Sequence, residues 1–210
     1  MAVICPTVTA FEPHQYRTQM EVLEAFAGRV HIDLMDGEFA PTTSPGLEQI
    51  WWPENLTADI HLMYQRPMDQ IEALIELGPS LVVIHAEAEV DHADFAAKLK
   101  AHNIQAGIAM LSDTTVESIE ELIPKFDHVL IFSGDLGHHG GVADLQLLNK
   151  VKEIHKKFPS LEISWDGGIN DQNAHQLIEA GVNVLNVGGY IADSQDPAAA
   201  YAKLKTVIEG

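Results

Sequence analysis

Residues 31–37 read HIDLMDG, a strand-like segment in which polar and aliphatic residues alternate. Successive side chains of a strand point to opposite faces. His31, Asp33 and Met35 therefore share one face, and the aliphatic residues between them share the other. The aliphatic face suits packing against helices. The other face places an imidazole and a carboxylate in a buried layer, which indicates a polar site at this strand.

Three further strand-like segments carry the same kinds of side chain. They are ADIHLMY with Asp59, His61 and Met63, VVIHAEAE with His85 and Glu87, and ISWDGG with Ser164 and Asp166. A lone strand-end histidine is usually a satisfied core residue, and a lone aspartate is often a helix cap. Burying several such groups without partners is costly. The joint pattern therefore indicates one site that uses them together.

Strand-like and helix-like segments alternate along the chain. Apolar, strand-like runs occur at residues 2–5, 29–34, 58–63, 81–85, 104–110, 128–132, 161–165 and 183–187. Runs with helical spacing of apolar residues lie between most of them, at residues 14–27, 67–78, 92–103, 116–126, 144–158, 170–181 and 198–210. Eight such units predict parallel strands that close into an α/β fold, a single (β/α)8 TIM barrel over residues 1–210. An open doubly wound sheet is the alternative, but it has no need of eight units.

The composition restricts the class of protein. Twelve Lys and Arg stand against 31 Asp and Glu, which gives a net charge of −19 and argues against nucleic acid or anionic lipid as a partner. No apolar run reaches the roughly 18 residues of a membrane span. The start MAVICPTV does not resemble a signal peptide, and Cys5 is the only cysteine. We therefore expect a cytoplasmic protein without a membrane partner.

A divalent metal ion would unite the histidines and aspartates of these segments. In a barrel the active site lies at the C-terminal ends of the strands, which is where these residues are expected. Imidazole and carboxylate ligands suit zinc, iron, cobalt or manganese. Two histidines and two aspartates from three strands can hold such an ion and leave a position for a substrate.

The motifs HIDLMDGEFAP, DIHLM, IHAEAE and WDGGIN, in this order and spacing, resemble those of the ribulose-phosphate 3-epimerase family. The similarity runs from ICPT near the start to NVLNVGGYI near the end. The resemblance implies a (β/α)8 barrel with one divalent metal ion (Zn, Fe, Mn or Co). It implies His31, Asp33, His61 and Asp166 as the metal ligands. Asp33 and Asp166 would also be the two catalytic acid/base groups.

The resemblance also implies how a ketose phosphate binds. Thr7 stands where the family usually has a serine that contacts the substrate. Met35 and Met63 would lie below the enediolate intermediate of the reaction. Phosphate would bind backbone amides of SGDLGHHGG at residues 133–141, of VGGYI at residues 187–191 and of the DGG turn. The implied substrate-binding residues are Thr7, Met35, His61, Met63, Gly137, Gly140, Gly167, Gly168, Gly188 and Gly189.

The implied reaction is the interconversion of D-ribulose 5-phosphate and D-xylulose 5-phosphate through an enediolate. Two carboxylates can remove a proton from one face and return it to the other, while a metal acts as a Lewis acid. Departures from the family's usual residues, at Thr42, Leu111 and His139, leave open a 3-epimerase of another ketose phosphate, such as a hexulose 6-phosphate. A non-catalytic sugar-phosphate-binding paralogue is the alternative from another class, although binding alone does not require two opposed bases. A related barrel lyase would not explain both histidine motifs.

Several other residues have simpler expected roles. Asp36 should anchor the loop that follows its strand, and Trp165 should face the helices opposite Asp166. His138 and His139 are either a solvated pair on a mobile lid or donors to phosphate or sugar, because imidazolium can donate to phosphate. Trp51 and Trp52 either pack in the core or form a subunit contact, since aromatic residues are enriched at interfaces. We expect a homo-oligomer.

Overall fold

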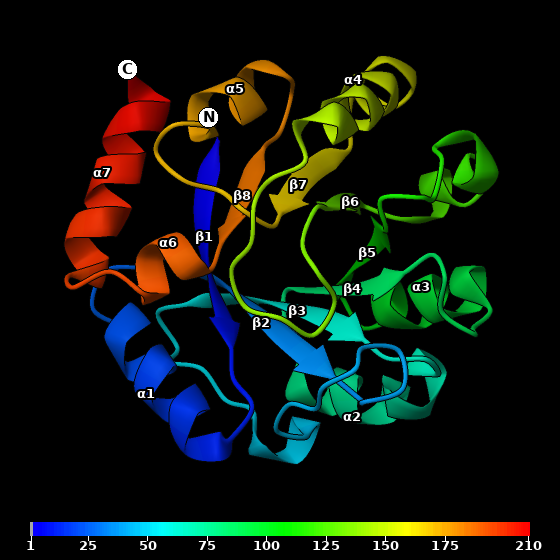
Figure 1. Ribbon diagram of the computed structural model, residues 1–210. Helices are drawn as coiled ribbons and strands as arrows, with labels where there is room; N and C mark the ends of the chain where they lie inside the picture. The colour runs from blue at the N-terminus through cyan, green and yellow to red at the C-terminus, as the bar shows by residue number, and fades with distance from the viewer. Residues whose placement is uncertain (1) are drawn as a thin grey trace.

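In the computed structural model, which describes residues 2–210, eight parallel strands form a closed barrel in chain order (Figure 1). The strands are β1 (Val3–Thr9), β2 (Arg29–Met35), β3 (Thr57–Met63), β4 (Leu81–His85), β5 (Gln105–Met110), β6 (His128–Phe132), β7 (Glu162–Asp166) and β8 (Val184–Val187). β8 pairs with β1 and closes the sheet. The structure confirms the predicted TIM barrel and rules out the open sheet.

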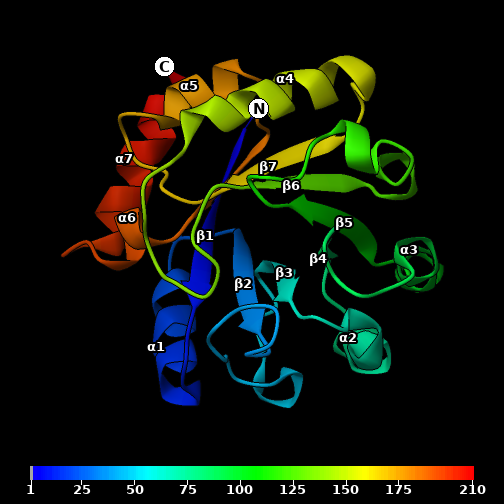
Figure 2. The ribbon, with the colours of Figure 1, turned by 45° about the vertical axis from the view of Figure 1, so that its right-hand side comes forward.

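Helices surround the barrel (Figures 1 and 2). They are α1 (Pro13–Leu23), α2 (Ile71–Leu77), α3 (His92–Ala101), α4 (Leu148–Lys157), α5 (Ala174–Glu179), α6 (Gly189–Ala192) and α7 (Pro197–Glu209). Short 3₁₀ turns are η1 (Leu47–Gln49), η2 (Pro67–Gln70), η3 (Glu117–Ile119), η4 (Ile123–Lys125) and η5 (Leu145–Leu147). Within residues 2–210, no helix is both long enough and apolar enough to cross a membrane.

The predicted helix over residues 116–126 is wrong in type. This segment, between β5 and β6, forms the two 3₁₀ turns η3 and η4 instead of an α-helix. Pro124 contributes to the difference, because proline has no N–H to donate to the Glu120 carbonyl, as an α-helix would require. The apolar spacing correctly indicated which side chains are buried, since Val116, Ile119 and Ile123 all lie in the core.

The alternation of side chains along the strands separates two layers. The aliphatic face of β2, including Ile32 and Leu34, is fully buried in the cluster that joins the barrel to its helices, and Trp165 lies in the same cluster as expected. Each such fully buried Leu or Ile contributes roughly 1.5–3 kcal/mol. The inward faces of β4, β5 and β6 form a separate apolar cluster that includes Val83 and Leu130. The polar site therefore occupies one side of the barrel interior.

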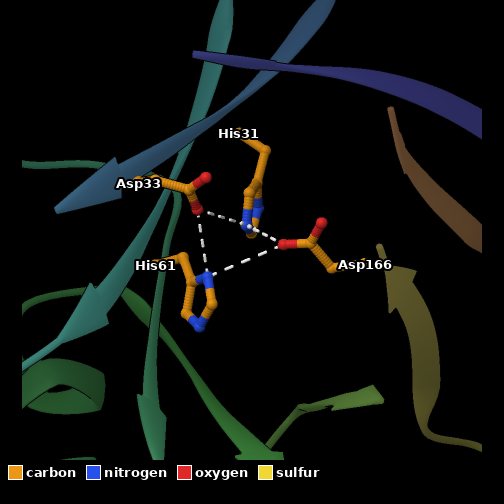
Figure 3. A group of neighbouring side chains, drawn as sticks. All are labelled: His31, Asp33, His61 and Asp166. Atoms are coloured by element: carbon orange, nitrogen blue, oxygen red, sulfur yellow. Dashed lines mark hydrogen bonds and ion pairs between the residues drawn. The ribbon is translucent and has the colours of Figure 1, made fainter. Parts of the chain in front are cut away.

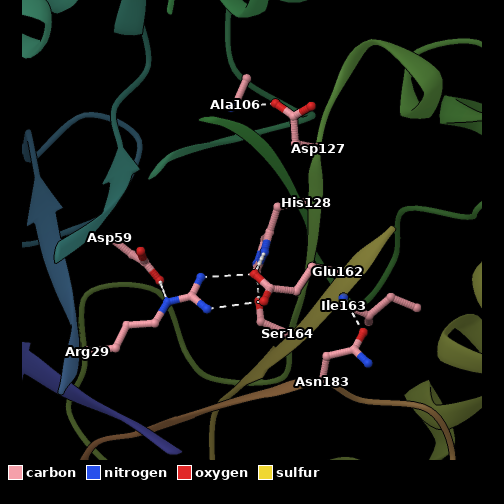
Figure 4. Close-up of polar contacts among 9 residues, drawn as sticks. All are labelled: Arg29, Asp59, Ala106, Asp127, His128, Glu162, Ile163, Ser164 and Asn183. Atoms are coloured by element: carbon pink, nitrogen blue, oxygen red, sulfur yellow. Dashed lines mark hydrogen bonds and ion pairs between the residues drawn. The ribbon is translucent and has the colours of Figure 1, made fainter. Parts of the chain in front are cut away.

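A polar network fills the N-terminal end of the barrel (Figure 4). Arg29 Nε donates to Asp59 Oδ2 at 2.6 Å, and its other nitrogens donate to both Glu162 oxygens at 3.1 and 2.9 Å. His128 lies between Glu162 and Ser164, with its ring nitrogens 2.9 and 2.6 Å from their oxygens. Burial raises the pKa of Glu162, but His128 and Arg29 outweigh this effect and lower it to about 2. This end of a TIM barrel serves stability rather than catalysis.

Candidate active site

Four side chains meet inside the barrel near the C-terminal ends of β2, β3 and β7 (Figure 3): His31, Asp33, His61 and Asp166. Each offers one ligand atom, and these atoms lie within 4.8 Å of one another. His31 Nε2 is 3.4 Å from Asp33 Oδ1 and 3.3 Å from Asp166 Oδ2. His61 Nδ1 is 3.1 and 3.7 Å from the same two oxygens. The structure thus brings together the four residues that the sequence motifs singled out.

Strand register explains how these residues meet. Asp33 pairs with His61 on the neighbouring strand, so both side chains enter the barrel at the same height. Asp166 ends β7, which is not adjacent to β2, and its carboxylate reaches the cluster from another side of the barrel (Figure 3). Gly167 follows with φ +111°, and a Cβ there would lie 2.6 Å from the backbone carbon of Ser133. Only glycine permits this turn, which holds Asp166 at the mouth of the barrel.

The electrostatics of the cluster favour a positive charge. Burial lowers the pKa of His31, but contacts with Asp166 and Asp33 outweigh burial and raise it to about 10. Burial raises the pKa of Asp33, but His31 and His61 outweigh that effect and hold it well below its usual range. Thr9 Oγ1 donates to Asp33 Oδ2 at 2.7 Å and fixes the orientation of that carboxylate.

The cluster fits a divalent metal ion. Two imidazole nitrogens and two carboxylate oxygens form a donor set that suits zinc, iron, manganese or cobalt. His31 Nε2 is buried and lacks a hydrogen bond to any described residue, because both carboxylate oxygens lie beyond normal hydrogen-bond geometry. Leaving a buried polar atom unpaired costs roughly 1–3 kcal/mol. A cation among these four atoms would remove that cost.

A third histidine, His85, lies directly behind His61. His61 Nε2 is 2.8 Å from His85 Nε2, and His85 Nδ1 is 3.4 Å from Glu87 Oε2. Burial lowers the pKa of His85 to about 4, although Glu87 opposes this shift. Burial raises the pKa of Glu87, but the His85 ring and hydrogen bonds from Thr114 and the Leu111 amide outweigh burial and lower it to about 2. The sequence pattern paired His85 with Glu87 but did not predict a contact with His61.

A cavity of about 280 Å³ opens over the cluster. Asp33 and Asp166 line it, together with every predicted substrate-binding residue except His61, namely Thr7, Met35, Met63, Gly137, Gly140, Gly167, Gly168, Gly188 and Gly189. His61 is fully buried behind the cavity wall. Thr7 Oγ1 is buried and lacks a hydrogen-bond partner in the described chain, so its hydroxyl is available to a bound molecule.

The loop at residues 133–141 forms one wall of this cavity. A Cβ at Gly188 would lie 3.5 Å from His139 Cε1, so the imidazole of His139 covers the turn between β8 and α6. His139 Nε2 is 3.5 Å from Asp193 Oδ1, whereas the His138 ring contacts the carbonyl of its own loop. Thr42 Oγ1 donates to the Gly137 carbonyl at 2.9 Å and ties the loop to the segment after β2.

Sequence reasoning did not single out several other residues that line the cavity. They are Thr9, Phe132, Asp135, Ile169, Asn170, Tyr190 and Asp193. All of them end or follow β1, β6, β7 or β8, so their position at or after the end of a strand was an available signal. Asp36 has the role that its position indicated, since its carboxylate accepts hydrogen bonds from the amides of Glu38, Phe39 and Gln65.

Comparisons with known proteins identify the family of this chain. The model of the Ribulose-phosphate 3 epimerase family matches residues 3–192. The chain is 34% identical over 186 residues to the ribulose-phosphate 3-epimerase of Helicobacter pylori, covering 85% of each chain. It is 28% identical over 188 residues to the "Ribulose-phosphate 3-epimerase, cytoplasmic isoform" of Oryza sativa subsp. japonica, covering 86% of this chain and 82% of that protein.

Among solved structures, a 3-hexulose-6-phosphate synthase matches 98% of this chain and 99% of its own, with a TM-score of 0.73 and 16% identity. At that identity the likeness concerns the fold alone. The family match and the Helicobacter relative concern the sequence itself, and they cover most of the chain. The chain therefore belongs to the ribulose-phosphate 3-epimerase family, a family of isomerases.

Proposed function

We propose that this protein is a metal-dependent epimerase that interconverts D-ribulose 5-phosphate and D-xylulose 5-phosphate. The observation that carries the proposal is the meeting of Asp33 and Asp166 with two histidines beside one cavity. Membership of the family supports the reaction class, and the names of the relatives support the substrate pair. Two aspartates from separate strands also argue against a protein that only binds a sugar phosphate.

One divalent ion, zinc, iron, manganese or cobalt, would be held by His31, Asp33, His61 and Asp166. The unpaired His31 Nε2 and the paired carboxylates support this assignment. When bound, the ion would supply a Lewis acid that stabilises negative charge on substrate oxygens.

Asp33 and Asp166 would act on opposite faces of the substrate, one carboxylate removing a proton and the other donating one. Epimerisation beside a ketone removes a carbon-bound proton from one face and returns one to the other. The two carboxylates come from β2 and β7, on different sides of the barrel (Figure 3), so each would serve one face of a planar intermediate. His31 and His61 favour the ionised form of Asp33, which is the form that can accept a proton.

The remaining wall of the cavity would bind the ketose phosphate. Met35 and Met63 pack together with Ala40 and would form an apolar floor that excludes water from the intermediate. The Thr7 hydroxyl would bind the sugar. Backbone amides of the loops that contain Gly140, Gly167, Gly168, Gly188 and Gly189, with Gly137 shaping its loop, would bind the phosphate.

A hexulose 6-phosphate is the second candidate substrate. A neighbouring cavity, lined by Leu111, Thr114 and Ser112, shares Phe132 and Asp135 with the first. It offers space for a longer sugar beside the proposed site. An epimerase specific for that sugar would turn over a hexulose 6-phosphate faster than a pentulose 5-phosphate.

We also propose a cytoplasmic location and a homo-oligomer. The rice relative is named a cytoplasmic isoform. Trp51 packs edge-on against Tyr16 and keeps 37% of its surface exposed, so a second subunit can cover the rest. Light scattering tests the assembly, and a monomeric mass at micromolar concentration would contradict it.

Turnover of defined sugars tests the proposed function. Purified protein should contain near-stoichiometric divalent metal and convert ribulose 5-phosphate to xylulose 5-phosphate. Chelation should abolish this conversion, and zinc, manganese, iron or cobalt should restore it. Full activity of metal-free protein would refute the role of the metal. Metal-loaded protein that leaves the pentulose unchanged but epimerises a hexulose 6-phosphate would replace the first candidate with the second.

A further inference from the structure

Two residues behind the proposed metal site belong neither to its four ligands nor to the lining of the cavity above it. Both His85 and Glu87 lie on the far side of His61 from Asp33. We infer that His85 and Glu87 are positioning residues that hold His61 in the tautomer whose Nδ1 can bind metal. This inference rests on the proposed metal-dependent function.

The contacts form one continuous chain of polar atoms. Asp33 Oδ1 lies 3.1 Å from His61 Nδ1, and His61 Nε2 lies 2.8 Å from His85 Nε2. The far nitrogen of His85 faces Glu87 Oε2 at 3.4 Å, an ion-pair contact outside hydrogen-bond geometry, and neither atom makes a hydrogen bond within residues 2–210. The rings of Phe39 and Phe132 lie 4.7 and 5.7 Å from the His85 ring. Among the described residues, the His85 side chain therefore has polar contacts with His61 and Glu87 only.

The short contact between the two rings restricts the positions of the protons. Two ring nitrogens at 2.8 Å share one hydrogen, so one of them donates and the other accepts. A lone pair on His61 Nδ1 is needed for metal binding, which places the proton of His61 on Nε2. His85 must then accept at Nε2 and carry its own proton on Nδ1. That proton faces Glu87.

Glu87 stabilises this direction and not the opposite one. If His85 donated to His61, its Nδ1 lone pair would face the ionised Glu87 oxygen, and His61 would carry its proton on the atom that must bind metal. Asp33 lies at the other end of the chain and draws the proton of His61 toward Nδ1. Asp33 and Glu87 thus favour opposite directions of the hydrogen bond between His61 and His85. Glu87 favours the direction that leaves a lone pair on His61 Nδ1 for metal.

Glu87 is held so that it cannot turn away. Its Oε1 accepts from the Leu111 amide at 3.0 Å and from the Thr114 hydroxyl. Lys150 in turn donates to the carbonyls of Leu111 and Thr114, at 2.8 and 2.7 Å. These contacts direct Oε2 at His85. Such indirect partners of metal-binding histidines typically change metal affinity 10- to 100-fold when they are substituted.

Glu87→Gln is the sharpest variant because it preserves shape and reverses polarity. The glutamine oxygen can still accept from Leu111 and Thr114, while its NH₂ would donate to His85 Nδ1. His85 would then carry its proton on Nε2, toward His61. We expect the affinity for Co²⁺ or Zn²⁺ to fall about 10- to 100-fold in Glu87→Gln. Thr114→Val is the matched control, since it removes a hydrogen bond to Glu87 but keeps the charge, and its affinity should stay within about threefold of the parent.

His85→Gln separates proton direction from packing. A glutamine at this position keeps an acceptor for the Nε2–H of His61 but removes the ring. If His85 served only as packing, this larger change would harm metal binding more than the isosteric Glu87→Gln. We expect the opposite order of metal affinities.

Nitrogen NMR of the zinc-loaded parent tests the proton positions directly. With ¹⁵N-labelled histidine, assigned by the signals lost in His85→Gln, His85 should carry its proton on Nδ1 and have an unprotonated Nε2. A proton on His85 Nε2, or parent-like metal affinity in Glu87→Gln, would overturn the inference. If Glu87→Gln fails to fold, the NMR result on the parent still decides. Neither measurement uses turnover, so a protein that binds metal as described but does not epimerise a pentulose phosphate would refute the proposed function alone.

Discussion

Replacing the two proposed catalytic aspartates one at a time should separate proton exchange from epimerisation. Asn keeps the shape of Asp but is not a general base. In Asp166→Asn, Asp33 remains and can still exchange the C3 proton of one epimer with solvent. In Asp33→Asn, Asp166 remains and should exchange the proton of the other epimer. Neither variant should complete epimerisation at a substantial rate, because one face of the intermediate has lost its acid.

The expected loss follows from the position of the two carboxylates. A positioned acid or base contributes about 10²- to 10⁴-fold, which corresponds to roughly 3–5 kcal/mol of activation free energy. The other acidic residues that line the cavity, Asp135 and Asp193, lie on the loop after β6 and at the end of α6, outside the four-residue cluster. They are not placed to replace a lost base. We therefore expect at least a hundredfold loss of kcat in each variant, with opposite exchange preferences.

Proton NMR in D₂O measures both quantities in one experiment. Each variant is incubated with one epimer at a time, and loss of the C3 proton signal is followed beside formation of the other epimer. Because both aspartates are proposed ligands, metal content is measured and excess metal is added. Asp59→Asn is the matched control. It replaces another buried, inward-facing aspartate, which pairs with Arg29 at the opposite end of the barrel.

The control should separate lost stability from lost chemistry. Removing one partner of a buried ion pair costs about 3–5 kcal/mol, and the Glu162 contacts that Arg29 retains should keep the loss near the lower limit. Asp59→Asn should therefore unfold at lower denaturant but still exchange and epimerise. The two-base assignment is wrong if a metal-loaded Asp33→Asn or Asp166→Asn variant epimerises within about tenfold of the parent.

Three further changes test other parts of the structure. Gly188 has φ −86° and ψ −99°, and Gly188→Val should raise KM for a phosphorylated ketose far more than it changes metal content. The control Gly28→Val, at a position with open space around its Cβ, should leave KM unchanged. An unchanged KM in folded Gly188→Val would place the phosphate elsewhere. Thr9→Val removes the donor to Asp33 Oδ2 and should lower kcat about tenfold, whereas an unaltered kcat would show that this bond does not orient the base. The pKa of Glu162 is lowered to about 2 in the folded protein, so ionised Glu162 stabilises the fold above its ordinary pKa of 4.5, and this stability is lost as pH falls from 4.5 toward 2. The free energy of urea unfolding of Glu162→Gln should differ from that of the parent at pH 7 and converge with it near pH 2. A difference that stays constant with pH would contradict the ion-pair explanation.

The barrel could be predicted from sequence because its strands obey a simple period. On β2 and β3 the alternation correctly separated the aliphatic face from His31, Asp33 and His61. The segment between β5 and β6 shows the limit of this reasoning. Its apolar spacing fits both a helix and two 3₁₀ turns, and Pro124 favours the turns.

Loop residues of the cavity were less predictable because no period governs them. His139 and Asp193 are far apart in the sequence and meet only because the loop after β6 folds over the turn after β8. The contact between His61 and His85 could not be predicted from the sequence for a similar reason. Alternation places both side chains inside the barrel, but the 2.8 Å distance between their rings depends on the curvature of the closed sheet.

Asp59 and His61 show why residue type alone does not identify the site. Both point into the barrel from β3, two positions apart, yet Asp59 pairs with Arg29 at the N-terminal end. There a resident cation lies between two carboxylates, those of Asp59 and Glu162. Near the C-terminal end, Asp33 and Asp166 also lie close together, but among the described residues neither a lysine nor an arginine lines the cavity above them. At the N-terminal end the positive charge is the side chain of Arg29. For Asp33 and Asp166 the positive charge must come from protons on the histidines or from a bound metal ion.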